Sequence, residues 1–270
     1  MLKNLIALAI AAVCLAAPAL AGKDGFSPDG VAEFSILPGW RTETGTYLAA
    51  LRVQLAPGWK TYWRAPGDGG SPPRVDWTGS ENLSAVTFHW PVPQVFYQNG
   101  MRSIGYTREL VLPMELTPKR AGGGIELRAE IEVGVCQDIC LPMAVRVAAA
   151  LDGAGQPDAR IRGALAARPA TGREAGLKSA ACRIEPIRDG LRVTARIDMP
   201  ALGSGEVAVF EHPDQSIWVS EASTRRTGGI LEAVTEMVPP SGAPFVLNRG
   251  QVRITVIGAG RAVDIVGCTG

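Results

Sequence analysis

Strict alternation of apolar and charged residues is the feature that most limits the fold of this 270-residue chain. In residues 125–133 the odd positions are all apolar, whereas the even positions are Glu, Arg, Glu and Glu. A period of two places the apolar side chains on one face of a β-strand, so that face should be buried. Similar runs, with Pro-Gly and Gly-Gly dipeptides between them, occur at 47–55, 110–116 and 144–148. Many short strands separated by turns predict an all-β antiparallel sandwich.

Residues 152–181 interrupt this alternation with repeated Gly and Pro, and only 159–167 are compatible with a short helix. We expect a linker there. Strands resume in the C-terminal part, at 191–197, 206–210, 217–219, 230–238, 252–257 and 262–266. The sequence therefore predicts a first β-sandwich over residues 22–151, a linker with a possible short helix over 152–181, and a second β-sandwich over 182–270.

Residues 1–21 have the features of a secretory signal peptide. Lys3 supplies the positive start, 5–17 are apolar, and Ala19-Leu20-Ala21 form a small-x-small cleavage site. The apolar stretch is shorter than the about 20 residues that span a bilayer, although an uncleaved membrane anchor is the alternative. Cleavage after Ala21 would discard Cys14 and leave a soluble periplasmic chain, not inserted in the membrane, in a compartment where disulfides persist.

The charge balance is neutral, since 27 Lys and Arg residues face 26 Asp and Glu residues. A polyanionic partner such as nucleic acid is therefore not expected. No cofactor is expected, and no metal ligands are assigned.

Four cysteines remain after the expected cleavage, and four cysteines allow three pairings. Cys182 and Cys268 flank the predicted strands of the second sandwich, so a bridge between them would clamp its ends. Closing a loop of that length stabilises a fold by about 4.6 kcal/mol on the chain-entropy model, whereas the ring of Cys136 and Cys140 is worth only about 2 kcal/mol. We therefore assign the Cys182–Cys268 bridge a structural role and the Cys136–Cys140 pair a reactive role. Crossed pairing between the two blocks is the alternative.

Three roles are open for Cys136 and Cys140: redox exchange, copper handling and a purely structural bridge. The intervening Asp138 should disfavour a thiolate, and no helix start is readable beside the pair. Such a pair would exchange slowly with bulk thiols and would need a protein partner that supplies an activated nucleophile. This behaviour is typical of a protein that carries electrons between specific partners. With Met143, the two sulfurs would also offer the soft ligands that suit Cu(I). We favour redox exchange.

Four motifs carry a family resemblance: Gly58-Trp-Lys-Thr-Tyr-Trp-Arg64, Phe96-Tyr97 ahead of Gly100, Leu110-Val-Leu-Pro113, and Cys140-Leu-Pro142. With these motifs, residues 40–150 resemble the N-terminal periplasmic domain of the thiol:disulfide interchange protein DsbD, and more closely its relative in ScsB, the suppressor of copper sensitivity. Residues 182–270 match the second sandwich of ScsB only loosely.

The resemblance implies an immunoglobulin-like sandwich in which an aromatic cap loop covers the redox pair. Phe96 is the expected cap, with Tyr97 beside it and Tyr62 lining the site from a neighbouring strand. Two prolines before Phe96 and the following Asn-Gly also favour a loop there. In the family the second cysteine bonds the partner, so Cys140 takes that role and Cys136 resolves the mixed disulfide.

The resemblance also implies partners. They are a thioredoxin-like domain or a membrane electron carrier of the DsbD or CcdA type, and periplasmic client proteins whose disulfides are reduced. The chain departs from DsbD in having three rather than five residues between its cysteines and no acidic residues just before Phe96. The expected function is that of a protein-disulfide reductase-like component that relays reducing equivalents. A periplasmic copper-tolerance module using the same cysteines is the alternative.

Overall fold

The structure is a computed structural model that describes residues 25–26, 30–98 and 100–270. The predicted signal peptide, its cleavage site and Cys14 lie outside the described residues. Within the described part, no helix has the length and apolar character needed to cross a membrane.

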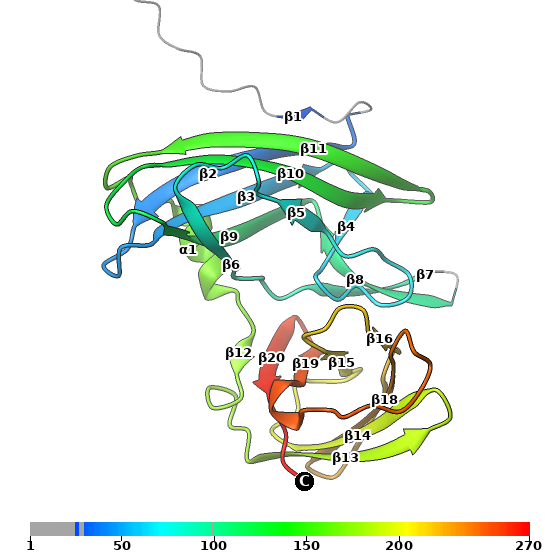
Figure 1. The fold of residues 1–270 in the computed structure, drawn as a ribbon. Helices are drawn as coiled ribbons and strands as arrows, with labels where there is room; N and C mark the ends of the chain where they lie inside the picture. Colours follow the sequence, from blue (N-terminus) through cyan, green and yellow to red (C-terminus); the bar gives the residue numbers. More distant parts are fainter. Residues whose placement is uncertain (1–24, 27–29, 99) are drawn as a thin grey trace, which may run out of the picture.

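The first sandwich consists of two facing sheets, drawn in blue to green in Figure 1. Sheet one has the strand order β1 (Gly25–Phe26), β2 (Ala32–Arg41), β3 (Tyr47–Leu55), β9 (Glu109–Pro118) and β6 (Leu83–Phe88). Sheet two has the order β11 (Cys140–Leu151), β10 (Ile125–Cys136), β4 (Lys60–Tyr62), β8 (Met101–Thr107) and β7 (Gln94–Gln98), with β5 (Arg74–Asp76) paired to β10. Phe34, Trp63 and Met114 are fully buried between the sheets.

The second sandwich follows in yellow-green to red in Figure 1. One sheet has the order β12 (Ala170–Thr171), β20 (Arg261–Val266), β19 (Arg253–Gly258) and β15 (Val207–Glu211). The other has the order β13 (Ser179–Ile187), β14 (Gly190–Asp198), β18 (Ile230–Val238) and β16 (Trp218–Val219), with β17 (Ser223–Thr227) also paired to β18. A short 3-10 turn, η1 (Arg249–Gln251), precedes β19. This sandwich has its own apolar core.

A single helix, α1 (Ala159–Ala166), is described between the two sets of strands. Asp158 caps it, because its carboxylate accepts the backbone N–H of Arg160 at 2.7 Å. Ile161 on this helix is fully buried against Leu37 and Ala50 of the first sandwich. The helix therefore packs on the outer face of sheet one, and only after it does the chain enter the second sandwich at β12.

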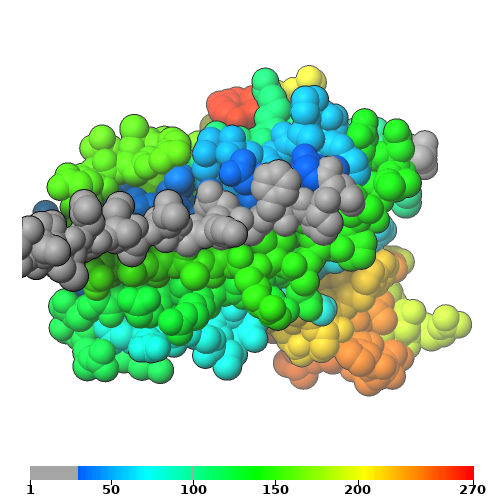
Figure 2. All heavy atoms as spheres, turned by 90° about the horizontal axis from the view of Figure 1, so that it is seen from above, coloured from blue at the N-terminus to red at the C-terminus, as the bar shows by residue number. Residues whose placement is uncertain are grey.

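The two sandwiches touch through both apolar and charged contacts. Val207, Val209 and Ile257 of the second sandwich belong to the core cluster of the first. The Arg64 guanidinium donates to both carboxylate oxygens of Glu211, at 2.9 Å each. In Figure 2, which is seen from above, the yellow and orange residues of the second sandwich accordingly emerge from behind the larger blue and green body.

The all-β fold with one short helix confirms the fold class predicted from alternation. The expected strands at 47–55 and 230–238 have the bounds of β3 and β18. Strand β10 continues beyond its predicted end at 133, because the disulfide holds its last residue, Cys136, against the first residue of β11.

Candidate functional site

The Cys136–Cys140 disulfide closes the tip of the β10–β11 hairpin. The two cysteines are the last pair in the register of these strands, with Cα atoms 4.1 Å apart. Three residues, 137–139, make the turn, and the Gln137 N–H donates to the Ile139 carbonyl at 3.0 Å. The short spacing seen in the sequence is thus a cross-strand bridge at an exposed hairpin end.

The two sulfur-bearing residues differ sharply in exposure. Cys136 is 1% exposed, because Tyr62 and the loop that follows β4 cover this end of the central strand β10. Cys140 is exposed, because it begins the edge strand β11. An incoming group can therefore approach one sulfur far more easily than the other.

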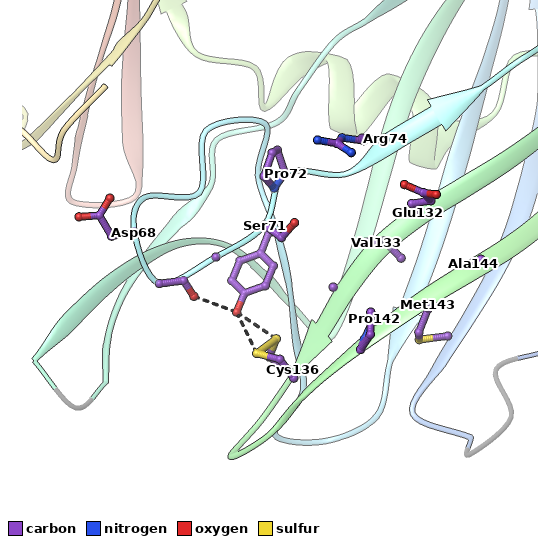
Figure 3. A pocket seen from close by; sticks show the side chains of 15 residues that line it. Asp68, Ser71, Pro72, Arg74, Glu132, Val133, Cys136, Pro142, Met143 and Ala144 are labelled. Atoms are coloured by element: carbon purple, nitrogen blue, oxygen red, sulfur yellow. Dashed lines mark hydrogen bonds between the residues drawn. A yellow bond between two sulfur atoms is a disulfide. The ribbon is translucent and has the colours of Figure 1, made fainter. Parts of the chain in front are cut away.

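Tyr62 contacts both sulfurs from the neighbouring strand β4. Its hydroxyl lies 3.0 Å from Cys136 Sγ, 3.5 Å from Cys140 Sγ and 3.1 Å from the carbonyl oxygen of Gly69 (Figure 3). Burial raises the pKa of Tyr62 above its ordinary value, so the hydroxyl keeps its proton at neutral pH. This single donor faces three acceptors, and the strongest acceptor among them receives the hydrogen bond.

Two glycines make room for the Tyr62 ring. A Cβ at Gly70 would lie 2.6 Å from the ring, and a Cβ at Gly134 would lie 3.1 Å from it. The ring is therefore held between the loop that follows β4 and the backbone of β10. Glycine inside a strand often marks such a close approach.

A pocket of about 620 Å³ opens beside the disulfide (Figure 3). The loop between β4 and β5 forms one wall, and the ends of β10 and β11 form the other. Asp68, Arg74 and Glu132 place charges around it, and Met143 also lines it. Within the described residues no group of three or more His, Cys, Asp and Glu side chains is arranged to hold a metal ion.

The strand register places Phe96 on the same sheet face as Tyr62 and the cysteines. Lys60 pairs with Cys136 and Thr107, and Phe96 pairs with Ser103, which is four residues before Thr107 and therefore on the same face of β8. The Lys60 ammonium lies 5.4 Å from the centroid of the Phe96 ring. Tyr97, the next residue, points to the other face and is 72% exposed.

Phe96 lies on strand β7 rather than on a loop, which differs from the sequence expectation. The prolines end before the pairing begins at Gln94, and the turn of the β7–β8 hairpin comes only after Gln98. The hairpin still reaches the cysteine turn, because the Gln98 side-chain amide donates to the Gln137 carbonyl at 3.3 Å.

Lys60 was not identified from the sequence. Its ammonium donates to Gln98 Oε1 at 3.1 Å and to Ser103 Oγ at 3.2 Å, and burial lowers its pKa. It is a cation directly across the strand pair from Cys136. The signal that could have located it is its position two residues before Tyr62, since strand residues i and i+2 share a face.

The second disulfide joins Cys182 on β13 to Cys268, two residues after the end of β20. The backbone supports this link, because the Cys182 N–H donates to the Thr269 carbonyl at 2.7 Å and the Thr269 N–H donates to the Ala180 carbonyl at 2.9 Å. The bridge thus ties together the first strand of one sheet and the segment that follows the last strand of the other.

Comparison with known proteins agrees with this geometry. No curated protein sequence matches the chain. The N-terminal periplasmic domain of ScsB from Proteus mirabilis has a similar structure, with a TM-score of 0.68 and 24% sequence identity over 90% of this chain and 96% of that chain. At this identity the similarity shows a shared all-β fold.

The sequence itself contains a family signature over the region that carries the disulfide. Residues 31–152 match the family described as the N-terminal domain of the thiol:disulfide interchange protein DsbD. Strands β2 to β11, Tyr62 and the Cys136–Cys140 pair all lie within this match. Residues 31–152 therefore form a domain of the DsbD N-terminal family with a disulfide-bonded cysteine pair at its outer sheet face.

Proposed function

We propose that the chain is a periplasmic thiol:disulfide interchange protein that relays reducing equivalents through Cys136 and Cys140. The donor is a thioredoxin-like domain or a membrane electron carrier of the DsbD or CcdA type, and the acceptors are client proteins with disulfides. The family of residues 31–152 supports the chemistry. The secretory features of residues 1–21 and the likeness to a periplasmic domain support the compartment.

The observation that carries the proposal is the inequality of the two sulfurs. Both cysteines line the pocket, but Cys140 is exposed, whereas Cys136 is 1% exposed and its sulfur lies closer to the Tyr62 hydroxyl. Disulfide exchange needs one accessible sulfur to be attacked and a second sulfur to leave. A bridge that only stabilised the fold would need neither an exposed sulfur nor a buried sulfur in contact with a hydroxyl.

The reductive step begins when a partner thiolate attacks Cys140 Sγ. The Cys136–Cys140 bond breaks, Cys136 leaves as a thiolate, and a mixed disulfide joins Cys140 to the partner. The Tyr62 hydroxyl, 3.0 Å from Cys136 Sγ, donates to the new negative charge. A second partner thiolate then attacks its own half of the mixed disulfide and releases Cys140, so the partner leaves oxidised and the pair here is reduced by two electrons.

Delivery to a client runs through the same sulfurs in reverse. The Cys140 thiolate attacks a client disulfide and forms a mixed disulfide, and the client's other sulfur leaves as a thiolate. Cys136 then attacks Cys140 Sγ and releases the reduced client. The internal disulfide is re-formed, and two electrons have passed to the client.

Apolar residues at the two hairpin tips support a protein as the partner. Ile139 in the cysteine turn is 64% exposed, and Tyr97 and Met101 on the β7–β8 hairpin are 72% and 55% exposed. The Gln98–Gln137 hydrogen bond joins these two tips. Exposed aromatic and aliphatic side chains around a reactive group are typical of a docking surface.

Thiol mapping tests the proposed function. When the oxidised protein is mixed with NADPH and catalytic amounts of thioredoxin and thioredoxin reductase, two thiols per chain should appear rapidly. Alkylation and mass mapping should place both at Cys136 and Cys140, because Cys182 is 2% exposed and its bridge is tied into two sheets. Rapid labelling of Cys182 and Cys268, with Cys136 and Cys140 still bonded, would contradict the proposal.

Copper handling is the second candidate, because Cys136, Cys140 and Met143 all line one pocket. After reduction these sulfurs would offer soft ligands to Cu(I). Titration of the reduced protein with Cu(I) against a competing chelator separates the two candidates. Tight binding by a protein that does not exchange disulfides with thioredoxin would favour the metal function.

The cap function of Phe96 gives a separate prediction. Phe96→Ala should increase the rate at which a small thiol reagent alkylates the reduced pair, because an uncharged cover on the shared sheet face is removed. Tyr97→Ala is the matched control, since that side chain points away and should leave the rate unchanged. A destabilised Phe96→Ala protein with unaltered alkylation would show that Phe96 only packs.

A further inference from the structure

A carboxylate of the second sandwich reaches the loop that forms one wall of the redox pocket. Glu221 lies between β16 and β17. Its Oε1 accepts the backbone N–H of Asp68 at 3.3 Å, and its Oε2 lies 3.3 Å from Arg102 Nε. Figure 3 shows Asp68 on this loop, away from the sulfurs.

The two contacts differ in kind: the Asp68 N–H donates a hydrogen bond to Glu221, whereas Arg102 Nε forms an ion pair with Glu221 without a hydrogen bond. A Cβ at Gly67 would lie 3.1 Å from Glu221 Oε1, so a side chain there would push the carboxylate back by a few tenths of an ångström. The Arg102 side chain is 10% exposed, and an arginine with so little contact with water needs a carboxylate partner. The backbone carbonyl of Arg102 also accepts the Gly69 N–H at 3.2 Å. Glu221 therefore holds the loop directly at Asp68 and indirectly through Arg102.

The same loop sets the position of Tyr62. Gly69 supplies the carbonyl that accepts the Tyr62 hydroxyl, and Gly70 lies against the ring. Since the hydroxyl stands 3.0 Å from Cys136 Sγ, a displacement of the loop alters the one hydrogen-bond donor aimed at the buried sulfur. Preorganised donors are effective because they need not move when charge develops.

We propose that Glu221 is a positioning residue for the redox pair: through the loop 66–70 it holds Tyr62 over Cys136, so that the second sandwich controls how readily the disulfide opens. This inference rests on the proposed function for its chemistry, in which Cys136 leaves as a thiolate. It assigns to the second sandwich a part in the reaction carried out by the first.

The expected effects of substitutions on the reduction rate follow from the chain of contacts that runs from Glu221 through the loop to Tyr62 and Cys136. Tyr62→Phe removes the donor and should slow reduction of the Cys136–Cys140 bridge by dithiothreitol about tenfold, the rate factor for one lost hydrogen bond to a charged group. Glu221→Ala loosens the loop but leaves the Tyr62 hydroxyl in place. It should therefore slow reduction less than Tyr62→Phe does, by about threefold.

The experiment is a double-mutant cycle on the rate of reduction by dithiothreitol. If Glu221 acts through Tyr62, then Glu221→Ala in the Tyr62→Phe background should cause no further slowing. Glu211→Ala is the matched control, because it removes another carboxylate that joins the two sandwiches, and its partner Arg64 lies outside residues 66–70. We expect the Glu211→Ala protein to be reduced at the wild-type rate.

Three results would overturn the inference: an unchanged rate in folded Glu221→Ala, additive effects in the double variant, or equal slowing by Glu211→Ala. If Glu221→Ala does not fold, Glu221→Gln takes its place, since the amide oxygen still accepts from Asp68 but the charge toward Arg102 is lost. The rate with a small dithiol needs no protein partner. A failure of this inference is thus distinct from a failure of the proposed relay, which would appear as normal reduction by dithiothreitol without exchange with thioredoxin.

Discussion

Replacing Cys136 with Ser should leave a large fraction of the chain covalently attached to its redox partner. Cys140 remains and forms the mixed disulfide, but the sulfur that would resolve it within this chain is gone. Because Cys140 is exposed and Cys136 is buried, Cys136→Ser should give on the order of ten times more adduct than Cys140→Ser, as thiol reactivity follows access.

Non-reducing electrophoresis of periplasmic extracts measures this difference. The adduct should disappear on reduction, and mass spectrometry should identify a thioredoxin-like domain or a membrane electron carrier in it. The double variant lacking both cysteines serves as the control, since Cys182 and Cys268 remain bonded. Equal adducts from the two single variants, or an adduct formed only through Cys136, would refute the assigned roles.

Removal of the Cys182–Cys268 bridge should cost the largest amount of stability. The two cysteines are 86 positions apart, and closing a loop of that length stabilises a fold by about 4.6 kcal/mol on the chain-entropy model. Cys182→Ala with Cys268→Ala is the suitable pair of changes, because Cys182 is 2% exposed and alanine leaves no unsatisfied hydroxyl there. Urea unfolding should show the loss as a lower midpoint.

The pair of Ala substitutions at Cys136 and Cys140 is the comparison for this experiment. The ring that their bridge closes is short, and its loss should cost only about 2 kcal/mol. An equal or larger loss of stability from this pair would show that the hairpin bridge is the main structural link.

Much of the strand pattern could be predicted from the sequence because burial on one face imposes a period of two. Strands with one buried face, such as β10 and β18, follow this period closely. The short strands β5 and β17 have no buried residue, so no apolar pattern marks them. Phe96 was predicted on a loop for a related reason: β7 is an edge strand whose pairing is fixed by β8 and not by its own composition.

The candidate site was predictable where its members are close in sequence and not where distant segments meet. Cys136 and Cys140 are four positions apart, and their spacing is visible in the sequence. The hydroxyl of Tyr62 reaches Cys136 across 74 positions, and Glu221 reaches Asp68 across 153. Family resemblance placed Tyr62 at the site, but nothing in the local pattern marks Glu221 or the glycines that admit the Tyr62 ring.

The unequal exposure of the two sulfurs also determines which cysteine reacts first with an oxidant. Peroxide reaches exposed thiolates first, so Cys140 is the sulfur that would be converted to a sulfenic acid. In the reduced protein the Cys136 thiol lies across the same hairpin tip, where the Cα atoms are 4.1 Å apart in the disulfide, so it can condense with that sulfenic acid, releasing water, before Cys140 is oxidised further. The product is the same disulfide that the electron donor reduces. In the proposed relay, oxidation of this hairpin would therefore yield the same disulfide intermediate, which the next two electrons reduce.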